Sequence, residues 1–108
     1  MKVVEYLAED DRSPFREWLD GLDRAARARV QVRIWRFQSG NFGDHKSVGG
    51  GVWEARLMFG PGYRVYFGKV REAVVVLLGA GKRSQRRDIR RAQRFWRAYL
   101  EEVSDDPT

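Results

Sequence analysis

The stretch Val52–Phe67, VWEARLMFGPGYRVYF, decides the fold that we expect for this chain. It predicts two strands joined around a Gly-Pro-Gly turn. One face of this hairpin is apolar: Trp53, Ala55, Leu57, Phe59, Tyr63, Val65 and Phe67. The other face carries Glu54, Arg56, Arg64 and Tyr66. We expect Ala55 to pair with Phe67, and Arg56 to lie opposite Tyr66, so that the apolar face covers a core.

The sequence on both sides of the hairpin predicts three helices and two more strands. Strands are expected at residues 3–7 and at 73–78, AVVVLL, whose continuous apolar character indicates cover on both sides. Ser13 and Asp23 are predicted to cap helices that end at Gly21 and Gly40, and Ser84 a final helix that reaches about Val103. Residues 41–51, NFGDHKSVGGG, are expected to form a loop.

These elements predict a small α+β domain in the order β-α-α-β-β-β-α. We expect an antiparallel sheet with its helices packed on one face. A chain of 108 residues is long enough for a single domain, assigned to 1–108, in which the tail 104–108 is expected to fray.

Composition excludes several classes of protein. The chain has no cysteine and a single histidine, which excludes disulfides and thiolate chemistry and disfavours a histidine zinc site, so we expect neither metal nor cofactor. The first residues, MKVVEYLAEDD, contain no apolar core of a signal peptide, and no later segment is long and apolar enough to cross a membrane. We therefore expect a soluble, cytoplasmic protein.

Positive charge is concentrated near the C-terminus. The whole chain has a formal net charge of +6, whereas residues 81–100 alone hold eight basic residues against Asp88. Such a segment favours a polyanionic partner, either nucleic acid or an acidic protein, although an arginine-rich helix is about as often a solvated face.

The polar face of the hairpin suggests a phosphodiester site. Two arginines on adjacent strands, Arg56 and Arg64, could bind a phosphate and stabilise its growing charge, with Lys46 before the hairpin and Lys82 after the last strand. Tyr66 could support an unstacked base. Alternatively this face is an ordinary wet sheet surface with weak cross-strand pairs, but four cations against one acid, Glu54, favour an anion site.

An RNA substrate would supply its own nucleophile, the 2′-hydroxyl, so the protein would need only a base, an acid and charge stabilisation. Candidates for the base are Glu54, held ionised by the arginines, and Lys46 or Lys82 in their positive surroundings. His45 alternates with Lys46 and is expected to point away from the sheet face that carries the others.

Three blocks of the sequence resemble the RelE/ParE superfamily of bacterial type II toxins, in particular the HigB-like "addiction module killer protein" branch. They are SPFREWLDGL, then GNFGDHKSVGGGVWEARLMFGPGYRVYF, and finally VVVLLGAGKRSQRRDIRRAQRFW, in which Ala80 stands where the branch usually has glycine. The middle block is the most specific, because D-x-K, W-E-x-R and G-P-G-Y-R-V-Y-F follow at tight spacing.

The resemblance implies a RelE-like fold and an mRNA endonuclease that acts in or near the ribosome. The catalytic residues that it indicates are Lys46, Glu54, Arg56, Arg64 and Lys82. The RNA-binding residues that we expect beside them are His45, Tyr66, Arg83, Gln85 and Arg86. The last helix of such toxins often supplies a catalytic tyrosine or histidine, but Tyr99 lies here on the apolar stripe.

The resemblance also implies a partner, a small helix-turn-helix antitoxin encoded beside the toxin. An acidic segment of it would suit the arginines of residues 83–97, and operator DNA would be bound only through the complex. Two alternatives remain open: a ParE-like inhibitor of gyrase that shares the fold but not the chemistry, and an inactive relative that binds RNA or antitoxin.

Overall fold

The computed structural model describes residues 1–104, which form an α+β domain with one five-stranded mixed sheet and three helices. The strands are β1 (Lys2–Glu5), β2 (His45–Gly49), β3 (Val52–Arg56), β4 (Arg64–Val70) and β5 (Ala73–Ala80). The helices are α1 (Pro14–Asp20), α2 (Arg24–Phe37) and α3 (Gln85–Ser104), the last preceded by a 3₁₀ turn, η1 (Lys82–Ser84). The α+β class and the three helices are as predicted.

The first two helices begin where their capping residues predict. The Ser13 side chain accepts a hydrogen bond from the backbone N–H of Arg16, and the Asp23 side chain accepts one from that of Ala26. Pro14 occupies the first turn of α1, where its missing N–H costs nothing. The tail expected at 104–108 cannot be compared, because Ser104 ends α3 and residues 105–108 lie outside the described residues.

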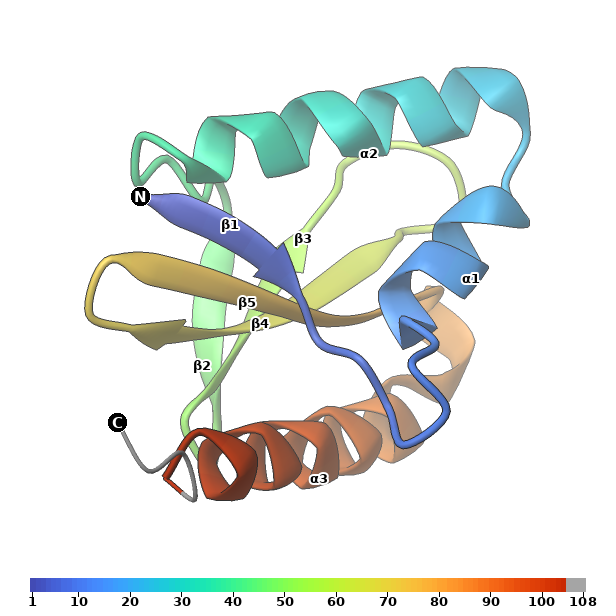
Figure 1. The fold of residues 1–108 in the computed structure, drawn as a ribbon. Helices are drawn as coiled ribbons and strands as arrows, with labels where there is room; N and C mark the ends of the chain where they lie inside the picture. Colours follow the sequence, from blue (N-terminus) through green and yellow to red (C-terminus); the bar gives the residue numbers. More distant parts are fainter. Residues whose placement is uncertain (105–108) are drawn as a thin grey trace.

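The sheet is mixed, and the expected purely antiparallel sheet is wrong. The strand order is β1-β5-β4-β3-β2, in which β1 runs parallel to β5 and the other neighbours are antiparallel (Figure 1). Strand β5 therefore has a partner on each side and is buried on both faces, as its apolar run predicts. A parallel pair requires a long connection, and here it contains α1 and α2 followed by β2, β3 and β4.

Residues 45–49 form a strand, where the sequence predicted a loop. Strand β2 is short, polar and at the sheet edge, so it lacks the apolar alternation that identifies a half-buried strand. The glycines that follow it make a tight turn to β3. Gly51 has a φ of 82°, and a Cβ there would lie 2.6 Å from Nε1 of Trp96, so the turn and the close contact with α3 both require glycine.

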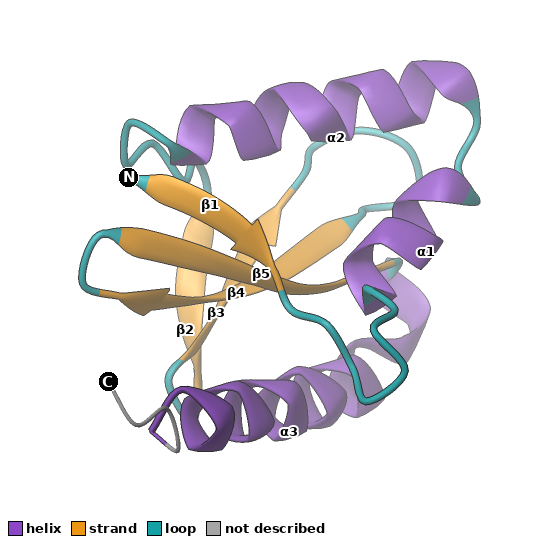
Figure 2. Cartoon of the chain, viewed as in Figure 1, coloured by secondary structure: helices purple, strands orange, loops and turns teal. Residues whose placement is uncertain are grey.

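Helices cover both faces of the sheet, which corrects the expected arrangement on one face (Figures 1 and 2). Helices α1 and α2 pack on the face that carries Val65 and Phe67, through Phe15, Leu19 and Val30. Helix α3 packs on the opposite face through Ala92 and Trp96, against Tyr66, Val75 and Leu77. The apolar stripe of α3 needs a sheet face of its own, and the first face is already occupied by the helical hairpin.

The β3–β4 hairpin keeps its predicted faces but not its predicted register. Ala55 pairs with Val65 instead of Phe67, Arg56 with Arg64, and Glu54 with Tyr66. The shift is two residues, which leaves every side chain on the expected side of the sheet. The connecting turn is longer for the same reason, and Leu57 N–H donates to the Tyr63 carbonyl at 2.9 Å across its base.

Candidate functional site

The structure brings most of the predicted site residues to one end of the face that α3 covers. Lys46 and Tyr66 flank Glu54 in one row across the sheet, and Arg56 pairs with Arg64 in the next row. Lys82, in η1, lies near Arg64, because both side chains approach Gly62. A Cβ added to Gly62 would lie 3.6 Å from Cβ of Lys82 and 3.9 Å from Nη1 of Arg64.

Glu54 and Arg64 form a buried ion pair at the centre of this group. Glu54 has no exposed surface, only 10% of the Arg64 side chain is exposed, and Arg64 Nε lies 3.4 Å from Glu54 Oε1. Gln85, the first residue of α3, donates from Nε2 to the other carboxylate oxygen of Glu54 at 2.9 Å. These contacts tie the start of α3 to β3 and β4, beneath the surface that Lys46 and Lys82 border.

The remaining predicted catalytic residues are exposed. Lys46 and Lys82 form no ion pair within residues 1–104, and both are open to solvent. Arg56, with 45% of its side chain exposed, pairs with Asp44, whose Oδ2 lies 3.2 Å from Nε. The expectation that Glu54 is the one acid facing the four cations is therefore wrong, because Asp44 partly neutralises Arg56.

Two predicted RNA-binding residues, Tyr66 and His45, do not lie on the surface around Lys46 and Lys82. Tyr66 has no exposed surface, because α3 covers its ring, so it cannot stack on a base. His45 lies on the opposite face of the sheet, as its alternation with Lys46 indicates, and packs against Phe42, Trp53 and Phe67 with ring centroids 5.5–6.4 Å apart. Neither side chain can belong to the surface around Lys46 and Lys82.

The Tyr66 hydroxyl is buried close to the Glu54 carboxylate, and among the described residues it makes no hydrogen bond of full geometry. Burial, followed by the negative charge of Glu54 and a weak hydrogen-bonding contact with its carboxylate, raises the pKa of Tyr66 above its ordinary value of 10.0. Asp88 raises this pKa further, and Arg64 opposes the shift. The hydroxyl therefore stays protonated in the folded chain well above the pH at which an exposed tyrosine ionises.

Replacing Tyr66 by Phe should leave the free energy of unfolding at pH 8 unchanged or raise it by up to about 1 kcal/mol, because the lost hydroxyl is buried without a well-formed hydrogen bond. Above pH 10 tyrosine ionises in the unfolded chain before Tyr66 does in the folded one, so wild-type stability should fall by up to about 1.4 kcal/mol per pH unit. The variant should lose less. Urea unfolding at pH 8 and pH 11 measures both effects.

Tyr63→Phe is the matched control for that experiment, because its ring is half-buried in the same hairpin. A cost above about 1 kcal/mol for Tyr66→Phe at pH 8 would show that the hydroxyl is hydrogen-bonded after all.

A shallow hollow of about 550 Å³ lies at the start of α3, next to Lys82. We call it the basic hollow; it is lined by Lys82, Arg83, Ser84, Gln85, Arg86, Arg87 and Arg90. Within residues 1–104 no acidic side chain lines it, so no described acid compensates the positive charges there. Arg83, Gln85 and Arg86, three of the expected RNA-binding residues, thus lie together beside the catalytic candidates.

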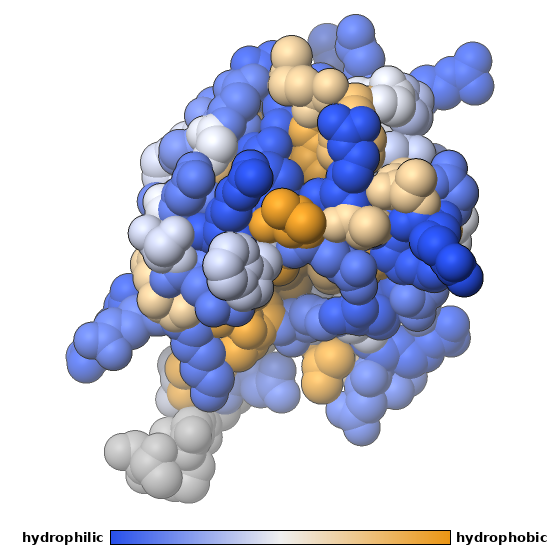
Figure 3. Space-filling model, turned by 90° about the horizontal axis from the view of Figure 1, so that it is seen from above, coloured by the Kyte–Doolittle hydropathy of each residue, from blue (hydrophilic) through white to orange (hydrophobic). Residues whose placement is uncertain are grey.

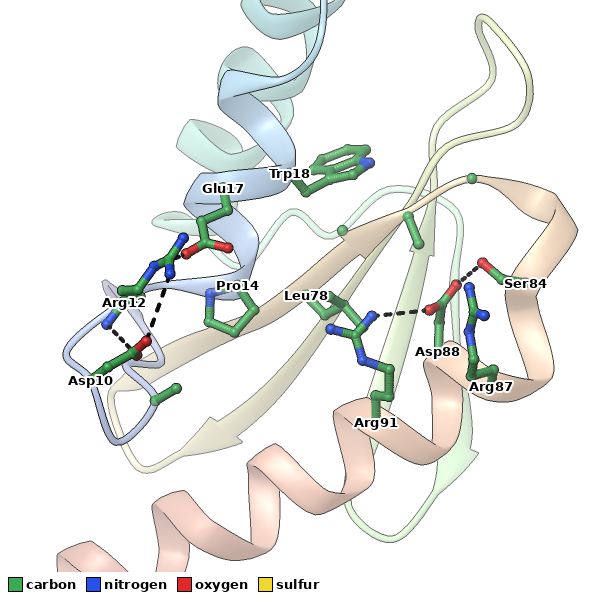
Figure 4. A pocket seen from close by; sticks show the side chains of 14 residues that line it. Asp10, Arg12, Pro14, Glu17, Trp18, Leu78, Ser84, Arg87, Asp88 and Arg91 are labelled. Carbon is green, nitrogen blue, oxygen red and sulfur yellow. Dashed lines mark hydrogen bonds and ion pairs between the residues drawn. The ribbon is translucent and has the colours of Figure 1, made fainter.

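A second hollow, of about 580 Å³, separates α1 from the start of α3 (Figure 4). Its charges are mostly paired: Arg12 with Glu17 and with Asp10, and Arg91 with Asp88 at 3.5 Å. Fewer unpaired positive charges are therefore available to bind an anion here than in the basic hollow.

Asp88, buried in this second hollow, is a residue that the sequence analysis missed. Its carboxylate accepts a hydrogen bond from the Ser84 hydroxyl, which fastens η1 to the first turn of α3. Its position as the sole acid in the basic segment 81–100, four residues after Ser84, was the available signal.

The described residues show neither a metal-type cluster nor a membrane span. Residues 1–104 contain no group of three or more His, Cys, Asp or Glu side chains that could hold a metal ion. No helix within that range is long and apolar enough to cross a bilayer.

The geometry defines an α+β domain with a buried Glu–Arg pair bordered by exposed basic residues. No protein-family model matches the chain. Over 81 residues it is 44% identical to an uncharacterized protein of Haemophilus influenzae, an alignment that spans 73% of this chain and 82% of that protein. The chain belongs to the same family as this protein.

Proposed function

We propose that this protein is the toxin of a bacterial type II toxin–antitoxin system with a RelE-like fold, and that it cleaves mRNA without a metal ion. The observation that carries this proposal is the set of exposed cations around one buried carboxylate. Lys46, Lys82 and the basic hollow border the Glu54–Arg64 pair, and this arrangement suits a phosphodiester better than a neutral ligand. The sequence resemblance to the RelE/ParE toxins supports the same reading.

In the proposed reaction the 2′-hydroxyl attacks the adjacent phosphorus as the bond from phosphorus to the 5′-oxygen breaks. The proton of the 2′-hydroxyl goes to a base, and an acid protonates the leaving 5′-oxygen. The products are a 2′,3′-cyclic phosphate and a 5′-hydroxyl end. Lys46 and Lys82 are exposed and can reach a substrate, so we assign the proton transfers to them and leave open which is the base.

Glu54 has a different role in this proposal from the one that the sequence suggested. Its carboxylate is buried beneath Gln85 and Arg64 and cannot contact a bound strand. We therefore assign it as the counter-ion that orients Arg64, with Gln85 as its second support. Arg56 and the exposed edge of Arg64 would bind the phosphate.

Replacing Lys46 or Lys82 by Ala should reduce RNA cleavage by about 10²-fold or more, because each change removes a proton-transfer group or a charge that stabilises the transition state. Lys2→Ala is the matched control, an exposed lysine on β1 at the other edge of the sheet. The measurement is controlled expression in bacteria followed by mapping of RNA ends that carry a 5′-hydroxyl.

Wild-type expression that arrests growth without new RNA ends would refute the nuclease assignment. DNA damage in that experiment would instead indicate the alternative, a ParE-like inhibitor of gyrase. Tight RNA binding without growth arrest would indicate an inactive relative. Full cleavage by both lysine variants would leave the nuclease but remove our assignment of its site.

The partner in this proposal is a helix-turn-helix antitoxin, through which the complex would bind operator DNA. Protein interfaces need apolar anchors, and α2 offers them: Trp35 is 69% exposed and Val32 is 49% exposed. Figure 3 looks down on the α2 side and shows hydrophobic side chains as patches among hydrophilic ones. Beside Trp35, a hollow of about 500 Å³ lies between α2, α1 and β1. We therefore place the antitoxin on α2 rather than on residues 83–97.

A further inference from the structure

We infer that the outer side of α3 is a second RNA-binding surface, which binds the phosphate backbone beyond the point of cleavage without reading sequence. Four arginines of α3 define this arginine stripe: Arg86, Arg90, Arg94 and Arg97. The inference rests on the proposed function in one respect, since the bound strand would be its substrate.

Helix geometry aligns the four side chains. Their spacing of four, four and three residues keeps them on one side of the helix, and the rise of 1.5 Å per residue spreads them over about 17 Å. The buried residues of α3, Asp88, Ala92 and Trp96, occupy the opposite side, against the sheet. The stripe therefore faces solvent along the length of α3, which lies below the sheet in Figure 1.

The charges of the stripe are not used inside the molecule. All four arginines are exposed, and none of them forms an ion pair within residues 1–104. Asp88, an acid in the first turn of the same helix, is buried and bound to Ser84 and Arg91, so it does not neutralise the stripe. Unpaired like charges on one surface repel one another, and a bound polyanion removes that repulsion.

The stripe is continuous with the candidate site at one end only. Arg86 and Arg90 line the basic hollow together with Lys82 and Gln85, and Gln85 contacts Glu54. At the other end the exposed Glu101 follows Arg97 and stops the positive surface. A strand that leaves the candidate site through the basic hollow would thus meet the other arginines in succession.

An RNA backbone fits this surface better than an acidic protein segment does. The exposed residues between the stripe arginines include no large apolar side chain, and the exposed Leu100 lies beyond the last of them, whereas a protein partner would need such anchors along the stripe. Phosphate contacts need none, because release of counterions supplies the affinity. Helix α2 is also rich in arginine, but there Arg33 binds two backbone carbonyls, Arg29 lies over the Phe59 ring, and Trp35 and Val32 are exposed.

The test compares two triple variants that remove the same charge. The stripe variant carries Arg90→Gln, Arg94→Gln and Arg97→Gln, and the control carries Arg24→Gln, Arg27→Gln and Arg36→Gln on α2. The probe is a fluorescent 2′-O-methyl RNA of about 12 nucleotides, which cannot be cleaved by 2′-hydroxyl attack. Fluorescence anisotropy from 50 to 300 mM KCl gives the slope of log affinity against log salt.

We expect the stripe variant to bind roughly 10- to 100-fold more weakly at 0.1 M salt. The slope of log affinity against log salt should become shallower by about 2, since each lost phosphate contact removes about 0.7. The control variant should keep the wild-type slope. Circular dichroism should show equal helix content and melting in all three chains, because the changed side chains are exposed, apart from the half-buried Arg27, and none of them forms an ion pair within residues 1–104.

Equal slopes for the stripe variant and the wild type would overturn the inference, as would an equal loss in both triple variants. Stripe-dependent binding of polyglutamate, with RNA binding unchanged, would overturn it in favour of an acidic protein segment. Cleavage is measured separately, by expression in bacteria and mapping of RNA ends. A chain that binds the probe through the stripe but produces no new RNA ends on expression would refute the proposed function and leave the RNA-binding surface standing.

Discussion

Replacing Arg64 by Met should lower the free energy of unfolding by about 3–5 kcal/mol, because the change leaves the fully buried Glu54 carboxylate without its cation. Adding Glu54→Gln to Arg64→Met should recover most of that loss, since the second change removes the uncompensated charge. Urea unfolding at pH 7 of the two single variants and the double variant gives the coupling energy between the two positions.

The Arg56–Asp44 pair supplies the matched control for that prediction. Arg56 lies on the same sheet face as Arg64 and pairs with an acid, but nearly half of its side chain is exposed. Arg56→Met should therefore cost no more than about 1 kcal/mol. Similar costs for Arg64→Met and Arg56→Met would mean that the Glu54–Arg64 pair is hydrated in solution, and the role of Glu54 as a buried counter-ion would be lost.

Replacing Gly79 by Ala should destabilise the protein by about 1–3 kcal/mol or more, because β5 meets the ring of Trp18 at this residue. A Cβ at Gly79 would lie 2.0 Å from Cε3 of Trp18, a distance that neither rigid strand nor indole ring can accommodate without moving. The backbone of Gly79 is not in the left-handed region, so the cost arises from packing alone. Thermal or urea unfolding measures it.

Two further variants make the result for Gly79 decisive. Gly81→Ala, two residues along the chain, places a Cβ with nothing within 4 Å and should change stability by less than about 0.5 kcal/mol. The double variant Trp18→Leu, Gly79→Ala should be more stable than the sum of the two single changes predicts. The reason is that leucine at residue 18 leaves room for the new methyl group at residue 79. Strict additivity would show that Trp18 is not what excludes a side chain at residue 79.

The parts of the fold that the sequence predicts well depend on local signals. The caps at Ser13 and Asp23 are set by hydrogen bonds within three residues, and the strand at 73–80 by its own apolar run. The polar edge strand β2 has no such signal. The parallel pairing of β1 with β5 depends on contacts between segments far apart in the chain, which a local pattern does not contain.

The contrast between local patterns and contacts between distant segments also explains which site residues the sequence places correctly. Alternation along β3 and β4 puts Glu54, Arg56 and Arg64 on one face, and this assignment is confirmed. Alternation does not reveal whether α3 covers that face. The sequence therefore predicts an exposed Tyr66, whereas the structure shows it buried. A charged strand face looks solvated in sequence, whereas here one of its ion pairs has been enclosed by the first turns of α3.

The pairing of β1 with β5 sets a time at which the domain can close during synthesis. Lys2 pairs with Ala73, so the first strand leaves the ribosome 71 residues before its partner (73 − 2 = 71). At about 5–20 residues per second, the interval is roughly 4–14 s. During it α1, α2 and the strands β2, β3 and β4 are made, but without β5 the sheet is incomplete, so the apolar side chains of β1 and of both helices are only partly covered. Nascent chains that stop before β5 should therefore be the species that chaperones and proteases bind, while a chain that has passed Ala80 can close the sheet.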